Sequence, residues 1–478
     1  MAIESRSIDF VPEHERHGRV RDQGPFWFLS NFHFFAIAIG FVGPSLGLSL
    51  GYTALSATLG ILTGTAFQAF HASQGPEMGL PQMIQSRAQF GYRGVIVPLL
   101  GTLVSLIGYN VVSTVLVSAG SHALWGVNRG AVAVAMSLLA AALAIWGYDW
   151  LHRVFKVLFW ISLPLFTLLT LAIVAGKVGA VSVAAGVPAA VGVSVAGVAS
   201  HASGFTWAAF VTQMASAASF NITAAPYVSD YSRYLPTRTP RSQIILNVFA
   251  GAALSAIWLI IVGAWLATHL GVDDGLLAIK LAGDRLLAGL GSILAVVSIA
   301  ALVATVGMNA YSSMLTFLTT LDSLRPVRPT RRLRVIVIVA AMVVWVAIAV
   351  GFGGNAVTYV NGMLVMMLYF LMPWTAVNLI DYFFLRRGQY SIPDLFDPKG
   401  IYGSWGVRGL SAYAVGFLVS VPFFVIPNVY TGPIAARLAG VDLGWLVSAL
   451  AASATYLALS SGSRKDTLQI GNRIPTVE

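Results

Sequence analysis

The chain has 478 residues, of which 57% are hydrophobic and only 10% are charged, and it contains no cysteine. Because roughly a quarter of the residues in soluble domains are charged, this composition excludes a soluble globular protein and indicates a polytopic membrane protein. The absence of cysteine excludes disulfides, thiolate metal sites and cysteine nucleophiles. A net charge of +10 would fit nucleic-acid binding, but the distribution of the basic residues, given below, argues against it.

Residues 1–25 are polar and of mixed charge, so we expect a cytoplasmic tail and no signal peptide. No charged residue occurs from Gln23 to Pro76, which is long enough for two spans. Three glycines and a proline lie halfway along the first span, between residues 40 and 47. In a helix interior a glycine costs about 1 kcal/mol and a proline about 3 kcal/mol relative to alanine. The backbone groups that they free need partners in lipid. We expect a broken helix of the kind that forms sites in secondary transporters, or else a helix kinked for packing.

Windows of about 20 apolar residues predict twelve membrane-spanning helices. Their ranges are 26–50, 53–74, 94–122, 130–148, 155–176, 205–227, 243–268, 289–320, 333–351, 356–385, 409–428 and 441–461. Residues 181–199 are apolar enough to form a thirteenth span. A thirteenth span would invert every later loop, however, and basic residues concentrate in cytoplasmic loops.

The distribution of lysine and arginine decides between these topologies. With twelve spans and a cytoplasmic N-terminus, most of the 28 basic residues lie inside. The exceptions are Arg129, Lys177, Lys280, Arg285 and Arg437. We therefore expect 181–199 to be an external loop of small residues, both termini to be cytoplasmic, and nucleic acid to be no partner.

Ionised groups are almost absent from the spans. Asp149, Asp230, Asp322 and Asp381 are placed at or near cytoplasmic helix ends, where pairing with loop arginines is the ordinary role. A carboxylate inside the membrane would mark a functional site, and none is predicted near mid-depth. A cavity between such helices favours a neutral or weakly polar substrate.

The segment GPEMGLPQMIQSRAQFGYRGVIVPLL at 75–100 resembles the linker between helices 2 and 3 in the purine-cytosine permease branch of the nucleobase-cation-symport-1 family. Three further stretches agree: SDYSRYLP at 229–236, residues 373–410 beginning PWTAVNLIDYFF, and PFFVIPNVYTGPIA at 422–435. The resemblance covers nearly the whole chain, from about residue 20 to 460.

This resemblance implies an all-α polytopic membrane protein with a LeuT-like fold. Helices 1–5 and 6–10 would form a 5+5 inverted repeat, helices 11 and 12 would be appended, and helices 1 and 6 would be broken. The expected organisation along the chain is a tail (1–25), first repeat (26–176), external loop (177–204), second repeat (205–385), cytoplasmic loop (386–408), helices 11–12 (409–461) and tail (462–478).

The resemblance also implies a nucleobase site between helices 1, 3, 6 and 8. Aligning the motifs gives nine residues in this site: Ile39, Gly40 and Phe41 at the helix 1 break, Tyr109 and Ser113 in helix 3, Phe220 and Asn221 in helix 6, and Asn309 and Ser313 in helix 8. Tyr109 replaces the family's usual tryptophan and can still stack on a ring. A one-residue slip would exchange Phe220 and Asn221. For each of these residues the alternative is helix packing, where small polar side chains often join membrane helices.

The expected coupling ion departs from the sodium-coupled pattern. The carbonyl positions would be Ala36, Ile39 and Ala304, but the two hydroxyl positions fall on Gly307 and Met308. Glycine has no side-chain oxygen and a thioether is a poor ligand for a hard cation, so proton symport is favoured over sodium.

The proton carrier is open between three residues. His33 lies in helix 1, and histidine titrates near physiological pH. Asp230 and Asp381 are the alternatives, and a purely structural role is the alternative for His33.

We therefore predict a transporter in the cell membrane that imports cytosine or purines by alternating access with a cation, acts as a monomer and needs no cofactor. Another neutral heterocycle is the main alternative: hydantoin, allantoin, uracil or a vitamin-like pyridine. A membrane enzyme is disfavoured because the histidines are scattered, with no metal-spaced pair in a span. A channel is disfavoured because no repeated pore motif is visible.

Overall fold

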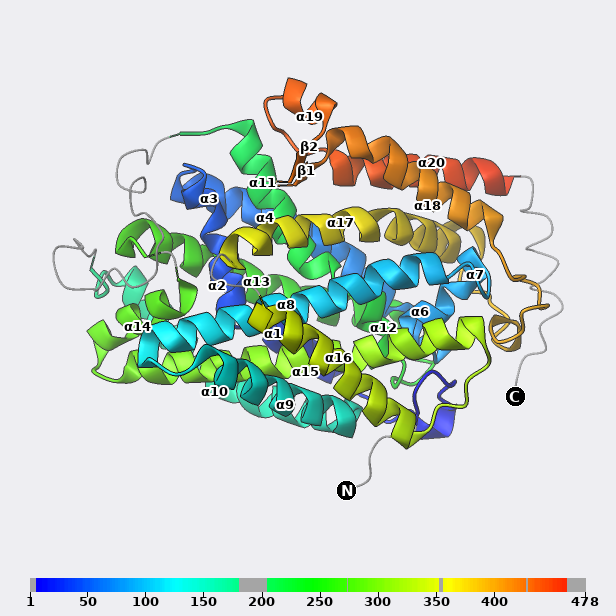
Figure 1. Ribbon diagram of the computed structural model, residues 1–478, viewed down its shortest axis with the longest axis horizontal. Helices are drawn as coiled ribbons and strands as arrows, with labels where there is room; N and C mark the ends of the chain where they lie inside the picture. Colours follow the sequence, from blue (N-terminus) through cyan, green and yellow to red (C-terminus); the bar gives the residue numbers. More distant parts are fainter. Residues whose placement is uncertain (1–5, 180–203, 273, 352–355, 427–428, 462–478) are drawn as a thin grey trace.

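The computed structural model describes residues 6–179, 204–272, 274–351, 356–426 and 429–461. Most of this part is helical, and the long helices run side by side along one axis of the molecule (Figure 1). The N-terminal segment, α6 and α7 lie at one end of that axis and α3 and α14 at the other (Figure 1). We call the first of these the termini end.

The helices of the first half are α1 (Val20–Asn31), α2 (Phe34–Gly40), α3 (Val42–Ser45), α4 (Leu50–Ala72), α5 (Gln74–Met78), α6 (Gln82–Gln85), α7 (Arg87–Phe90), α8 (Ile96–Trp125), α9 (Arg129–Trp146) and α10 (Tyr148–Val174). Those that follow are α11 (Trp207–Ile222), α12 (Val228–Ser232), α13 (Arg241–Leu270), α14 (Gly275–Leu286), α15 (Leu290–Leu324), α16 (Arg331–Gly351), α17 (Ala356–Ile380), α18 (Val407–Ser420), α19 (Pro433–Arg437) and α20 (Gly444–Ser460). A small antiparallel hairpin joins β1 (Val425–Ile426) to β2 (Tyr430–Thr431).

Eight helices of the described part are long and apolar enough to cross a membrane, and the bent pair of α1 with α2 and α3 makes nine. The shorter apolar helices Val407–Phe423 and Gly444–Ser460 are not in that number. The chain is thus a polytopic all-α membrane protein, and the count of twelve spans stays a prediction. The whole segment 181–199, expected as an external loop, lies outside the described residues.

Both helices expected to be broken are discontinuous. The first bends by 60° between Val20–Asn31 and Phe34–Ser45. The other breaks after α11, where a 3-10 turn at Ala225–Tyr227 precedes α12. Several elements were not predicted, among them α14, an additional helix between α13 and α15, and the β1–β2 hairpin with α19 between α18 and α20.

The break of the first helix is not where the glycines predict it. Ile39 and Gly40 lie inside α2, and the bend falls at Phe32 and His33. Gly40 has another role, because a Cβ there would stand 2.2 Å from the Ile260 carbonyl oxygen of α13. Small residues let membrane helices approach this closely, so the glycine permits backbone packing and does not interrupt the helix.

The helices that bear on the site pack in two groups. The first, which we call the broken-helix group, contains α1, α2, α4, α11, α12 and α13, and the second, the α8–α15 group, contains α8, α9, α15 and α16. Helix α10 contacts both groups. The break of the first helix lies at the boundary between the two groups, where it faces α15 and α8.

Candidate functional site

The site begins with the two residues that interrupt the first helix. Phe32 (φ −93°, ψ 62°) and His33 (φ −150°, ψ 169°) leave helical geometry between α1 and α2. Both side chains are fully buried. A chain break frees backbone groups from the helical ladder, and in a buried break each of them needs another partner.

Two hydroxyls of α15 supply partners on either side of the break. The Phe34 amide donates to Ser298 Oγ at 2.7 Å, and Thr305 Oγ1 donates to the Ser30 carbonyl at 3.4 Å and to the Ala301 carbonyl of its own helix at 3.1 Å. Ser298 and Thr305 are seven residues apart, so they share one face of α15. This face holds the broken helix against the α8–α15 group.

His33 is held in one tautomer by its surroundings. Its Nε2 lies 2.9 Å from the Ser30 carbonyl oxygen, and a carbonyl only accepts, so Nε2 carries the hydrogen. Nδ1 is then an acceptor, and it has no hydrogen-bond partner in the described part of the chain. A buried acceptor without a partner is costly unless a ligand or water supplies a donor.

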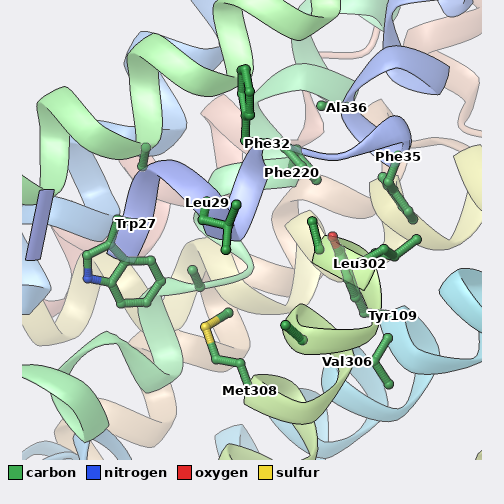
Figure 2. Packing of buried hydrophobic residues seen from close by; sticks show 14 of the residues in the cluster. Trp27, Leu29, Phe32, Phe35, Ala36, Tyr109, Phe220, Leu302, Val306 and Met308 are labelled. Carbon is green, nitrogen blue, oxygen red and sulfur yellow. The ribbon is translucent and has the colours of Figure 1, made fainter. Parts of the chain in front are cut away.

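Three aromatic rings from three helices meet beside the break. Phe35 of α2 stacks on Tyr109 of α8 with centroids 4.9 Å apart and planes 17° apart. It also stacks on Phe220 of α11, at 5.6 Å and 10°. Figure 2 shows these side chains together with Leu302 of α15. His33 presents its ring edge-on to Phe35 and Phe220, at 6.4 and 6.2 Å.

The structure thus brings Tyr109 and Phe220 of the predicted set into one aromatic cluster with His33. Asn221 does not join it. Its amide accepts from Asn31 Nδ2 at 2.8 Å and donates to Thr65 Oγ1 at 2.5 Å, so Asn221 ties together α11, α1 and α4.

Three further predicted polar residues lie on the faces that turn inward. Ser113 is one turn beyond Tyr109 on α8, and its buried hydroxyl has no partner among the described residues. Asn309 is one turn beyond Thr305 on α15, and its Oδ1 likewise lacks a donor in that part of the chain. Ser313 donates to the Asn309 carbonyl at 2.7 Å within its own helix. Phe41, in contrast, follows α2 and is only half-buried.

Two of the residues aligned as ion ligands, Gly307 and Met308, contact other parts of the structure. Gly307 faces α9, where a Cβ would contact the Ala140 carbonyl oxygen at 3.0 Å and Leu143 at 3.1 Å. The Met308 carbonyl accepts a hydrogen bond from the Tyr231 hydroxyl at 2.9 Å. Figure 2 shows the Met308 side chain on the Trp27 and Leu29 side of the cluster.

The remaining ion-site positions lie within regular helices. Ala36 and Ile39 are inside α2, and Ala304 is inside α15 beside Thr305. The hydroxyls that face the break are therefore those of Ser298 and Thr305. Sequence reasoning missed both, although their seven-residue spacing on an apolar helix was visible.

The two alternative carboxylates lie elsewhere. Asp230 is in α12 and accepts from the Gln82 amide at 3.1 Å. Asp381 follows α17 and accepts from Gln89, Tyr390 and Tyr456 at 2.7 to 2.9 Å, besides the guanidinium of Arg386. Each is embedded in a network at the termini end, away from the break.

Sequence reasoning also missed Phe35, which is 1% exposed and contacts both rings of the cluster. The run of aromatic residues from Phe32 to Phe35 was the available signal. A break predicted further along places this run inside a continuous helix, where its aromatic residues are expected to pack.

Comparisons with known proteins agree on the class of protein. Residues 10–448 match the family described as permeases for cytosine/purines, uracil, thiamine and allantoin. YxlA of Bacillus subtilis, named as a putative purine-cytosine permease, is 30% identical over 96% of both chains. The yeast purine-cytosine permease FCY2 of Saccharomyces cerevisiae is 25% identical, over 55% of this chain and 47% of its own.

Solved structures show the same fold at low identity. Mhp1, a nucleobase-cation-symport-1 family transporter, in a closed conformation with bromovinylhydantoin bound, superposes with a TM-score of 0.72 at 17% identity, covering 97% of each chain. Its inward-facing conformation gives 0.66, covering 98% of this chain and 99% of the other. The relatives are permeases and transporters and not enzymes. This chain belongs to the family of permeases for cytosine/purines, uracil, thiamine and allantoin.

Proposed function

We propose that the chain is a secondary active transporter that imports cytosine or a purine by cation symport, through alternating access. One observation carries the proposal: an aromatic cluster of Tyr109, Phe220 and Phe35 stands beside the break, next to the unpartnered His33 Nδ1. Planar heterocycles bind by stacking on such rings. Their ring N–H groups are the donors that a buried nitrogen acceptor lacks.

The polar groups around the cluster fit a neutral ligand. The described spans place no carboxylate in the cluster. Among the predicted site residues, three buried atoms have no partner in the described part of the chain: His33 Nδ1, the amide oxygen of Asn309 and the hydroxyl of Ser113. These groups would pair with the amide-like edge of a nucleobase. Substrates of similar shape, such as hydantoin, allantoin, uracil or a pyridine vitamin, are the alternatives. The vitamin B6 transporter TPN1 of Saccharomyces cerevisiae is itself 25% identical to 56% of this chain.

We propose proton coupling in preference to sodium. Gly307 and Met308 bring no side-chain oxygen to the break, and the Ser30 carbonyl already accepts from His33 and Thr305. Sodium is the second candidate, and the hydroxyls of Ser298 and Thr305 favour it because a hard cation prefers oxygen ligands.

The carrier of the proton is also proposed. His33 is at the break itself, with Asp230 and Asp381 as alternatives. Replacing His33 by Gln keeps a side-chain donor and acceptor at the position but removes the titrating group. If His33 carries the proton, the variant still binds substrate but no longer accumulates it in a pH gradient.

We further propose that the termini end faces the cytoplasm of a cell or inner membrane and that one chain is sufficient for transport. Most basic residues lie in the segments of that end, as the positive-inside rule requires.

The decisive experiment is uptake of labelled cytosine, adenine, hypoxanthine, uracil and allantoin into proteoliposomes. Sodium and pH gradients are varied independently. We expect one or more bases to accumulate when a pH gradient is imposed without sodium. Uptake that follows sodium at fixed pH and ignores a protonophore would overturn proton coupling, and failure of all five compounds to enter or compete would overturn the nucleobase assignment.

A pair of substitutions tests the cluster directly. Tyr109→Ala removes the stacking face and should weaken binding of the transported base by about tenfold or more, since aromatic pairs are worth about 0.5–1.5 kcal/mol beyond buried area. Tyr109→Trp keeps a larger face and should retain binding. Unchanged affinity in Tyr109→Ala would remove this residue from the site.

A further inference from the structure

The ring of Phe35 covers the faces of Tyr109 and Phe220 on which a planar ligand would stack. We propose that Phe35 is a built-in competitor of the substrate, and that the substrate takes these faces only after Phe35 has left them. The identity of the substrate rests on the proposed function, but the competition itself rests on ring geometry alone.

The geometry is that of a bound aromatic ligand. Phe35 is almost parallel to both partners, with centroid distances of 4.9 Å to Tyr109 and 5.6 Å to Phe220. Offset parallel stacking at such distances is how aromatic rings attract each other. All three side chains are buried, so water does not hold these faces. A heterocycle and the Phe35 ring therefore exclude each other from the same positions.

The backbone of Phe35 is fixed, so its ring leaves by side-chain rotation or its partner moves away. A Cβ at Gly40 would stand 2.2 Å from the Ile260 carbonyl oxygen, and one at Gly263 would stand 2.1 Å from the Ile37 carbonyl oxygen. Helices α2 and α13 are thus packed backbone to backbone. The Phe34 amide is also bonded to Ser298 of α15.

The stack also crosses the boundary between the two helix groups. Phe35 and Phe220 belong to the broken-helix group, whereas Tyr109 belongs to the α8–α15 group. Movement of one group against the other would separate Tyr109 from Phe35 and leave the Phe35–Phe220 contact intact. The Phe35–Tyr109 stack therefore opposes movement of one helix group away from the other, and it is lost when they separate.

A competitor of this kind lowers apparent affinity. When only a fraction of the molecules is competent to bind, the apparent Kd rises by the inverse of that fraction. Removing the ring should tighten binding by about tenfold, the size expected when two ordinary ring contacts need no longer be broken. Removal of the Phe35 ring should also enlarge the space beside Tyr109 and Phe220. The affinity for bicyclic purines should therefore increase more than the affinity for monocyclic pyrimidines.

The test compares Phe35→Leu and Phe35→Ala with Phe34→Ala in the full-length protein in lipid nanodiscs. Leucine keeps most of the volume without an aromatic face. Phe34 is a matched control because it is the neighbouring residue of the same helix, is 2% exposed, and makes no aromatic ring contact in the part of the chain that the structure describes. We measure the Kd of the labelled base that the wild type takes up. Tighter binding in both Phe35 variants and not in Phe34→Ala is expected, and equal or weaker binding in Phe35→Leu would overturn the proposal.

A second measurement does not depend on the transported substrate. Indole, a planar ring without the polar edge of a base, should raise the melting temperature of Phe35→Ala and leave that of Phe34→Ala unchanged. If indole stabilises Phe35→Ala while the wild type transports no heterocycle, the proposed function fails and the competition stands. If indole stabilises neither variant, the competition fails whatever the wild type transports.

Discussion

The hydroxyl of Tyr231 donates a hydrogen bond to the backbone carbonyl of Met308 at 2.9 Å. This bond joins α12 to α15 and therefore crosses between the two helix groups on the termini side of the break. The same hydroxyl also lies 3.5 Å from Ser312 Oγ of α15. The contact ties the two helix groups together on this side of the break, and a movement that separates α12 from α15 must break it.

We expect Tyr231→Phe to favour the state that is open toward the termini end by about 2- to 10-fold, because a net hydrogen bond is worth about 0.5–1.5 kcal/mol. The chain has no cysteine, so a single Thr316→Cys substitution gives a clean reporter. Thr316 is 2% exposed and lies two turns beyond Met308 on α15. The rate of its reaction with a maleimide should rise in the Tyr231→Phe background.

Tyr227→Phe is the control for this experiment. Tyr227 is also buried, and its hydroxyl makes no hydrogen bond among the described residues. Equal labelling rates in the Tyr231→Phe and Tyr227→Phe backgrounds would show that the bond does not hold α12 and α15 together.

Gly40→Ala should lower stability strongly or abolish folding. The new Cβ would meet the Ile260 carbonyl oxygen at 2.2 Å, and backbone on backbone cannot yield as a flexible side chain does. Overpacking typically costs about 1–3 kcal/mol and sometimes more. Gly51→Ala is the control, because a Cβ at Gly51 in α4 meets nothing within 4 Å. Melting temperatures from fluorescence-detected gel filtration would distinguish the two, and an unchanged value for Gly40→Ala would contradict the close packing.

The buried ion pair of Arg87 with Asp322 should be essential for stability. Arg87 is fully buried, and its guanidinium donates to Asp322 Oδ2 at 2.8 Å and to the Leu395 carbonyl at 3.1 Å. Removing one partner of a buried pair costs about 3–5 kcal/mol. We therefore expect Asp322→Asn to give little folded protein, measured as the monodisperse yield after extraction.

An exposed pair at the same end provides the comparison. Arg241 and Glu77 are 2.7 Å apart with side chains 43% and 32% exposed, and such pairs contribute about 0–1 kcal/mol. Arg241→Ala should leave the yield close to that of the wild type. A similar loss in both variants would mean that burial does not set the importance of the Arg87 pair.

The pH dependence of stability should contain a contribution from Asp442, which precedes α20. Burial raises the pKa of this carboxyl from 3.8 to about 6, although the Tyr369 hydroxyl and the Gly444 amide donate to it and act in the opposite direction. A raised pKa means that the folded state binds the proton more tightly than the unfolded state. The stabilisation is complete below about pH 4 and is lost as the pH rises through 6, by up to about 3 kcal/mol at about 1.4 kcal/mol per pKa unit.

Asp442→Asn should remove this contribution. The difference in melting temperature between wild type and variant should change between pH 4 and 7 and be flat above 7. Asp397→Asn, at an exposed position, is the control and should leave the wild-type pH profile intact. A parallel profile for wild type and Asp442→Asn would refute the raised pKa.

The sequence predicted the class of fold because the hydropathy of long helices and the family motifs are both properties of continuous stretches. The location of the break in the first helix could not be predicted in the same way. Glycine has two uses in a membrane helix, interruption and close packing, and only the neighbour decides between them. At Gly40 the neighbour is α13, which lies more than two hundred residues later in the chain.

The same reason explains what was found and missed in the candidate site. Tyr109 was predicted because it occupies a motif position of the family, and Phe220 because it is the aromatic residue beside the aligned position Asn221. Phe35, Ser298 and Thr305 are next to the break that the structure shows at Phe32 and His33. Because the predicted break lies further along the first helix, the residues predicted around it are different ones. Asn221 looked equally suited to a ligand, and only its partners Asn31 and Thr65 show that its amide is already used.

The glycine contacts between the first helix and α13 also bear on the order in which the protein assembles. A Cβ at Gly251 would stand 2.2 Å from the Gly24 carbonyl oxygen on α1, and the contacts of Gly40 and Gly263 join α2 to the same helix. The unbroken helix α13 thus packs closely against both halves of the broken helix, α1 and α2. During synthesis the first helix emerges long before α13, so its 60° corner has no template until α13 has been inserted. The candidate site at that corner can therefore form only after α13 and the later helix α15 have been inserted.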